Sequence, residues 1–172
     1  MKRISTTPVF DNWFTNLRNR RAVHRIQARI DRAEDGNFGD CAPVGEGVSE
    51  MRIHFGPGYR VCFAQRGNCR SIRMGTIKLR KWDSAEHLKT DEDMVLYLEA
   101  CMEEAGDDAA FIAKALGNIA RAKGMTQLAK DTGLGRESLY KALSGEGNPS
   151  FATILKVTRA LGIKLHPETM TA

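Results

Sequence analysis

Residues 68–88 read NCRSIRMGTIKLRKWDSAEHL, and the residue pattern of the chain changes within this stretch. Before it, apolar and polar residues alternate, which is the period of a strand; after it, apolar residues recur every three or four positions, which is the period of a helix. The pair Met74-Gly75 at the change resembles the start of a second protein. At 172 residues the chain has room for two small domains. We therefore expect an α+β domain followed by an all-α domain.

The first part of the chain predicts a strand, two helices and a small antiparallel sheet. Ile4–Thr7 is strand-like and leads into a helix at Pro8, where proline is tolerated. Two apolar stripes at helical spacing follow. Apolar residues then alternate on both sides of the turn Gly56-Pro57-Gly58, which predicts a hairpin, and one more strand is expected at about Cys69–Arg73.

The polar face of the predicted hairpin carries Arg52, His54 and Arg60. Arginine forks can stabilise charge on phosphate oxygens, and a histidine can move a proton near neutral pH. These three residues are therefore candidate catalytic residues toward a phosphodiester. The alternative is that arginines on an exposed strand only keep the sheet edge soluble.

The phrases GNFGD (36–40), VGEGVSEMRI (44–53) and GPGYR (56–60) are specific enough to indicate a family. With the helical sequence before them, they resemble the HigB-like branch of the RelE/ParE superfamily of bacterial toxins over about residues 5–72. The resemblance implies a ribonuclease that cuts mRNA on the ribosome without a metal, using the 2′-hydroxyl of the RNA as nucleophile. It assigns phosphate binding and proton transfer to Arg52, His54 and Arg60.

The resemblance stops after Ile72-Arg73. HigB-like toxins usually continue into a Gly-Gly-Asp-Lys-type segment and a closing helix, and this chain continues with different sequence. We therefore expect a truncated toxin domain at residues 1–73, with weakened catalysis. Residues 76–82 alternate apolar and basic side chains, and a strand there would pair with the toxin sheet and partly replace what is absent.

In the last part of the chain, two short helices are expected on either side of a turn that contains Gly133. Thr126 would cap the first helix, and the second would begin near Arg136. This arrangement is typical of a helix-turn-helix, whose second helix enters the major groove of DNA; the alternative is a plain helical bundle. Leucines would form the packed underside, so the DNA-facing candidates are the polar residues Gln127, Arg136, Glu137, Ser138, Tyr140 and Lys141.

The run MTQLAKDTGLGRESLYKAL (125–143) and its flanking sequence resemble HigA-like antidote proteins of the Xre/Cro helix-turn-helix class, over nearly all of residues 76–166. The resemblance implies an antitoxin that neutralises a partner toxin and, usually as a dimer, represses its own operon. Met74 would then be the start of the antitoxin, in the toxin-first order that is usual for this branch. The motif departs from the family pattern at Gly135, where a small hydroxyl residue often sits.

Charge divides the chain into three blocks. Residues 1–73 carry 13 basic and seven acidic side chains, residues 83–108 one basic and ten acidic, and residues 109–172 nine basic and four acidic. Basic blocks suit nucleic acids, and the acidic block could neutralise one of them; the alternative is that all three are solvated helix faces. We expect a linker and toxin-neutralising segment at residues 74–108 and a DNA-binding domain at residues 109–172.

No metal, cofactor or membrane contact is expected. The four cysteines show no C-x-x-C pair and no His partner at zinc-site spacing, so they are expected to be reduced and buried. No run of residues approaches the ~20 apolar positions of a membrane helix. The sequence therefore predicts a cytoplasmic protein.

Three hypotheses about function follow from the sequence. The first is a fused toxin–antitoxin protein, most simply a homodimer, that binds operator DNA as an autorepressor while its toxin half is inactive or masked. The second keeps an active ribonuclease, meeting mRNA on the ribosome, that its own antitoxin half inhibits within one chain or between chains. The third is an interaction protein that binds related toxins or antitoxins without regulating anything. Whether the protein is an enzyme stays open at this point.

Overall fold

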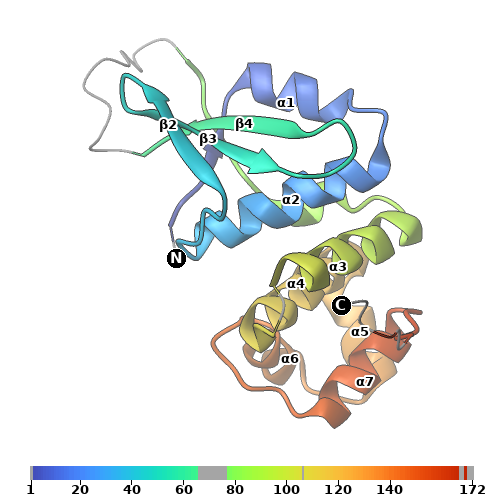
Figure 1. Ribbon diagram of the computed structural model, residues 1–172. Helices are drawn as coiled ribbons and strands as arrows, with labels where there is room; N and C mark the ends of the chain where they lie inside the picture. The colour runs from blue at the N-terminus through green and yellow to red at the C-terminus, as the bar shows by residue number, and fades with distance from the viewer. Residues whose placement is uncertain (1, 66–76, 106, 167–168, 170–172) are drawn as a thin grey trace. The chain divides into compact units, whose positions relative to one another are not determined.

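The computed structural model describes residues 2–65, 77–105, 107–166 and 169. The chain divides into two compact units, Met1–Ser84 and Ala85–Ala172. The first unit combines helices with small antiparallel sheets and the second is built from helices (Figure 1). The expected fold class, α+β followed by all-α, is thereby confirmed.

Within its described residues, the N-terminal unit has two separate antiparallel sheets. Strands β2, β3 and β4 form one sheet in that order, and β1 pairs with β5 in the other. The two helices of the unit lie between β1 and β2 in the chain. The elements are β1 (Ser5–Thr6), α1 (Pro8–Thr15), α2 (Arg20–Glu34), β2 (Cys41–Gly45), β3 (Val48–Ile53), β4 (Tyr59–Ala64) and β5 (Arg80–Lys81).

Helix α2 supplies the centre of the N-terminal core. The side chain of Asn19 caps the helix by accepting from the amide of Ala22, at 3.1 Å. Ile26 and Ile30 are four residues apart, so they share one face of the helix. That face packs against the apolar side chains of β3 and β4, and the buried cluster comprises Phe14, Ile26, Ile30, Ala33, Met51, Ile53, Val61 and Trp82.

The predicted hairpin is confirmed as β3 and β4, in a register that pairs Arg52 with Arg60. Its turn needs glycine, because Gly56 and Gly58 have φ angles of 57° and 81°. Strand β2 was not predicted. The expected strand at Cys69–Arg73 and the pair Met74-Gly75 lie outside the described residues.

The strand expected within residues 76–82 is present, but it is short. It covers Arg80–Lys81 and pairs with β1, not with the three-stranded sheet. The next residue, Trp82, is buried in the core of the N-terminal unit. A segment that follows the change of sequence pattern is therefore part of the N-terminal fold.

The C-terminal unit is helical throughout its described secondary structure. A short 3₁₀ helix at Ser84–His87 leads into it. Asp108 caps α4 by accepting from the amide of Phe111, and Ser150 caps α7 by accepting from the amide of Thr153. The helices are α3 (Asp91–Ala105), α4 (Ala109–Lys123), α5 (Met125–Thr132), α6 (Arg136–Ala142) and α7 (Phe151–Ala160).

Helix α4 is the central helix of the C-terminal core. Leu116 and Ile119 on α4 are buried together with Leu128 of α5, Leu139 of α6 and Val157 of α7. Among the helices described, none is long and apolar enough to cross a membrane.

Replacing Gly117 with alanine should destabilise the C-terminal unit, although alanine is the better helix former by about 1 kcal/mol. A Cβ at this position of α4 would clash with the backbone carbonyl oxygen of Leu143. Overpacking of this kind costs about 1–3 kcal/mol, so we expect a net loss of stability. Urea unfolding followed by circular dichroism measures it. Ser138→Ala, at an exposed position of α6, is the control and should leave the midpoint unchanged or slightly higher; a more stable Gly117→Ala chain would contradict the packing described.

Candidate nucleic-acid interfaces

Helices α5 and α6 are short and joined by three residues. Helix α5 ends at Thr132, and the next residue, Gly133, adopts the left-handed conformation with a φ of 67°. The hydroxyl of Thr132 donates to the carbonyl of Leu128 at 2.7 Å, which tightens the last turn. Helix α6 then begins at Arg136 with Gly135 at its N-cap, where no side chain caps the helix. The connection is therefore set mainly by backbone conformation.

The predicted start of the first of these helices is wrong. Thr126 was expected to cap it, but α5 begins at Met125 and Gly124 occupies the N-cap without a side-chain hydrogen bond. Gly124 also ends α4, and its φ of 112° lets the chain change direction between the two helices. Because one glycine serves both helices, Thr126 lies inside α5.

The six DNA-facing candidates lie on the exposed side of α5 and α6. Leu128, Leu139 and Leu143 are 4%, 0% and 4% exposed, so they form the buried underside of the pair. The guanidinium carbon of Arg136 lies 5.6 Å from the ring centroid of Tyr140, within cation–π range. All six candidates are exposed: Gln127, Arg136, Glu137, Ser138, Tyr140 and Lys141.

A second polar face lies on β3 and β4. Arg52 and Arg60 are opposite each other in the strand register, so their side chains share one face of the sheet. Glu50 lies beside them: Arg52 Nε donates to Glu50 Oε1 at 2.9 Å, and Arg60 Nη1 is 3.7 Å from Glu50 Oε2. The hydrogen bond and charge of Glu50 raise the pKa of Arg52 above its ordinary value. One nearly buried carboxylate thus contacts both candidate arginines.

His54 follows directly after β3 and is held by a carboxylate. His54 Nε2 lies 2.7 Å from Asp40 Oδ2. This hydrogen bond is the main reason that the pKa of Asp40 lies below its ordinary value; partial burial opposes the shift, while the charges of Arg52, His54 and Arg29 add to it. The amide of Arg52 donates to the carbonyl of Asp40 at 2.9 Å, which ties the two segments together. A carboxylate on one imidazole nitrogen orients the ring and fixes its tautomer.

The structure thus brings Arg52 and Arg60 together and adds two acids that the sequence did not indicate. Glu50 alternates with apolar residues in a strand, and Asp40 follows a glycine in a loop, so both look like ordinary surface acids in the sequence. The hairpin register could have indicated Glu50, because it lies two residues from Arg52 on the same face.

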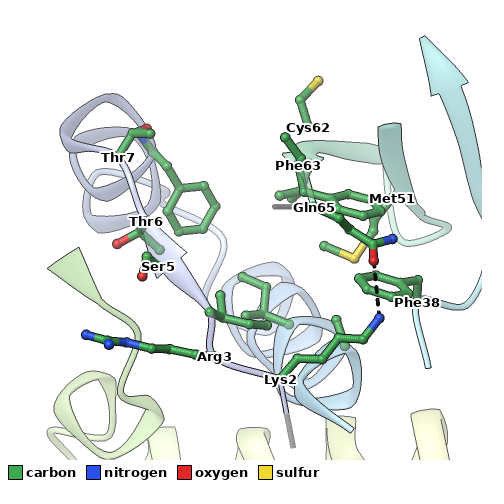
Figure 2. A pocket seen from close by; sticks show the side chains of 16 residues that line it. Lys2, Arg3, Ser5, Thr6, Thr7, Phe38, Met51, Cys62, Phe63 and Gln65 are labelled. Atoms are coloured by element: carbon green, nitrogen blue, oxygen red, sulfur yellow. Dashed lines mark hydrogen bonds between the residues drawn. The ribbon is translucent and has the colours of Figure 1, made fainter. Parts of the chain in front are cut away.

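The N-terminal unit also contains a groove of about 430 Å³ between β1 and the end of β4 (Figure 2). Phe38 and Phe63 stack in its wall with ring centroids 4.9 Å apart, and Lys2 Nζ donates to Gln65 Oε1 at 3.2 Å across it. The described residues that line the groove include no Asp, Glu or His. The groove therefore lacks a carboxylate or an imidazole among its described lining residues.

Within the described residues, no group of three or more His, Cys, Asp or Glu side chains could hold a metal ion. Cys101 is buried, as expected, but Cys41 and Cys62 are exposed. The expectation of burial is wrong for these two because they lie on solvent-facing positions of β2 and β4. Cys69 lies outside the described residues.

Comparison with known proteins defines the class of the chain as an antidote of an addiction module. Residues 78–169 match the family described as "Probable addiction module antidote protein", and the chain belongs to this family. An antidote role implies a toxin as partner.

Two similar proteins of Haemophilus influenzae are both named "Uncharacterized protein". One is 51% identical over 89 residues, which is 52% of this chain and 90% of that protein. The other is 51% identical over 59 residues, which is 34% of this chain, and the match spans 60% of that protein's length. No solved structure matches the chain.

Substituting His54 should raise the pKa of Asp40 toward its ordinary value of 3.8. In the intact chain the carboxyl titrates below this value, so its contribution to stability is present above the unfolded pKa and is lost as the pH falls through the folded pKa. Titration of the Asp40 side chain by NMR in the wild type and in His54→Ala measures the shift. His166→Ala, which removes an exposed histidine of the other unit, is the control; an Asp40 pKa that is equal in wild type and His54→Ala would show that the hydrogen bond is absent in solution.

Proposed function

We propose that this antidote is a fused toxin–antitoxin protein that acts mainly as a DNA-binding autorepressor. In this proposal α5 and α6 form a helix-turn-helix within a DNA-binding domain at residues 109–172. The domain binds operator DNA as a homodimer in the cytoplasm. The N-terminal unit is a HigB-like toxin domain, residues 1–73 in sequence, that is truncated and inactive or masked.

The observation that carries the proposal is the division of α5 and α6 into a buried and an exposed side. Leu128, Leu139 and Leu143 are turned into the core, so a run of polar side chains stands on one surface of α6. A helix fits the major groove of B-DNA, where an arginine can read guanine through two hydrogen bonds. Arg136 is suited to that role, and Lys141 and Gln127 to phosphate contacts.

Charge supports DNA as the partner of this part of the chain. Residues 109–172 carry nine basic and four acidic side chains, whereas residues 83–108 carry ten acidic and one basic. A DNA-binding face needs positive charge against phosphates, and this distribution gives it to the helices of the proposed domain. The acidic segment, within residues 74–108, suits a basic toxin-like partner instead.

The N-terminal unit supports a toxin-like ancestry with reduced activity. Arg52 and Arg60 are placed on one sheet face, as phosphate binding requires. Glu50 contacts both of them, so the face attracts a phosphate less strongly than two free arginines would. The Gly-Gly-Asp-Lys-type segment of HigB-like toxins is also missing from the sequence.

The proposal predicts that Arg136→Ala weakens binding of the full chain to DNA from upstream of its own gene by about 5- to 150-fold, or about 1–3 kcal/mol. Lys141→Ala should weaken binding to all sequences and lower the slope of log affinity against log salt by about one. Fluorescence anisotropy over a salt series measures both effects.

Lys89→Ala is the matched control, because it removes an exposed positive charge from the same unit outside α5 and α6. It should leave affinity and salt slope close to the wild type. Equal losses in Arg136→Ala and Lys89→Ala would argue for non-specific attraction to DNA and against a recognition helix.

A second candidate function is an active mRNA-cleaving toxin that its own antitoxin half inhibits. The observation that favours it is the contact between His54 and Asp40 beside the two arginines, because a carboxylate-held imidazole is a common proton-transfer arrangement. Residues Arg52, His54 and Arg60 would be its catalytic residues.

We expect no cleavage of translated mRNA, mapped by primer extension, in bacteria that express either the full chain or its N-terminal unit, residues 1–84, alone. Cleavage by the unit alone that is suppressed in the full chain, abolished by Arg60→Ala and retained in Arg18→Ala would instead establish the second function. Arg18 is an exposed arginine of the same unit that lies outside the sheet, so it controls for loss of charge alone.

A further inference from the structure

We propose that Arg80–Ser84 is the anchor segment with which this antidote holds its toxin-like unit, by adding a strand to β1 and burying Trp82. This inference takes one point from the proposed function, namely that the N-terminal unit is toxin-like. The contacts themselves are all within that unit.

The family match and the structural division do not coincide. The antidote family match begins at residue 78, whereas the N-terminal unit extends to Ser84. Residues 78–84 therefore belong to the antidote in sequence and to the N-terminal unit in structure. A segment with this double membership is where an antidote would hold a toxin.

The main chain of the anchor segment adds to a strand edge. Ser5 pairs with Lys81 and Thr6 with Arg80 in an antiparallel register. The amide of Trp82 then donates to the carbonyl of Ile4 at 3.2 Å, which extends the pairing by one residue. Strand addition is a common way for one protein to bind a peptide of another, with specificity left to the side chains.

Trp82 supplies the apolar part of that specificity. Its side chain is 4% exposed, and its ring lies edge-on to Phe14 at 5.5 Å and to Phe10 at 6.1 Å between centroids. It belongs to the same buried cluster as Met51 and Val61. A buried aromatic side chain in a closely fitting site is the typical source of binding energy at an interface.

Asp31 supplies the polar part. This carboxylate on α2 is 1% exposed, and it accepts from Trp82 Nε1 at 2.8 Å and from Ser84 Oγ at 2.5 and 2.6 Å. Gln27 Nε2 donates to the carbonyl of Ser84 at 2.9 Å. A buried carboxylate that loses such donors is strongly disfavoured, so α2 selects a tryptophan followed two residues later by a hydroxyl.

The anchor lies on the opposite side of the sheet from the candidate arginines. Met51 and Val61 face the core that contains Trp82, and side chains alternate along a strand, so Arg52 and Arg60 face away from the anchor. The anchor therefore holds the N-terminal unit from its core side and leaves the arginine face uncovered. Its role is attachment, and any masking of that face needs another part of the antidote.

The test is a full chain with a protease site introduced between Met74 and Gly75, cleaved after folding. We expect the two fragments of the wild type to elute together in gel filtration, and the Trp82 indole N–H to remain protected from exchange. Trp82→Ala should abolish co-elution. Val9→Ala is the control, because Val9 is an apolar side chain of the same unit that is 80% exposed; its fragments should stay together.

Peptide competition keeps the test decisive if Trp82→Ala unfolds the N-terminal unit. A synthetic peptide of residues 78–90 should displace the C-terminal fragment from the cleaved wild type, and the same peptide with Trp82→Ala should not. Wild-type fragments that separate on cleavage, or a complex that the peptide leaves intact, would overturn the proposal. Failure of the chain to bind operator DNA would contradict the proposed function but would not change the co-elution of the fragments. The proposed function and the anchor segment are therefore tested separately.

Discussion

The carboxylate of Asp31 is the group on which the N-terminal unit most depends. It is buried in the face of α2 and bonded by two side chains that come more than fifty residues later in the chain. A buried neutral group that loses its hydrogen-bond partner destabilises a protein by about 1–3 kcal/mol, and a buried charged group by more. Such a loss is a large fraction of the folding free energy of a small domain. Because Trp82 and Ser84 are two of its donors, we expect the N-terminal core to be less stable without the start of the antidote region.

This constraint separates two roles on the two faces of one small sheet. The core face packs against α2 and Trp82, while the other face carries Arg52 and Arg60 with Glu50 between them. Attachment of the antidote segment and any chemistry at the arginines are therefore performed by different surfaces. The C-terminal unit adds a third surface, the polar side of α5 and α6, which we propose for DNA. A single chain thus carries an attachment surface, a basic sheet face and a helical polar face.

Regular apolar patterns predicted most of the fold, because the spacing of apolar residues indicates both the type of element and its buried face. Helix α2 and the β3–β4 hairpin were predicted in this way, and so were α5 and α6 of the C-terminal unit. Strand β2 was missed because Cys41–Gly45 contains a proline and has little buried surface to create a pattern. The start of α5 was misplaced because a glycine, not a hydroxyl side chain, begins it.

The candidate sites were only partly predictable for a similar reason. Arg52 and Arg60 follow from alternation and hairpin register, which are local properties of the sequence. Asp31 and Asp40 take their roles from partners in other segments, and an acid in a charged sequence looks solvated until its neighbours are known. The same holds for Trp82, whose sequence neighbours are charged while its spatial neighbours are aromatic.

Native-state hydrogen exchange of the intact chain would test most directly whether residues 80–84 belong to the N-terminal unit. Exchange is followed by NMR at several low denaturant concentrations, and each unit reports through its own core helix. We expect the opening reaction that exposes the Trp82 indole N–H to exchange to have the same free energy and denaturant dependence as the opening that exposes the amides of Ile26 and Ile30 in α2. An indole N–H that exchanges with Leu116 and Ile119 of α4, or without protection, would contradict the account.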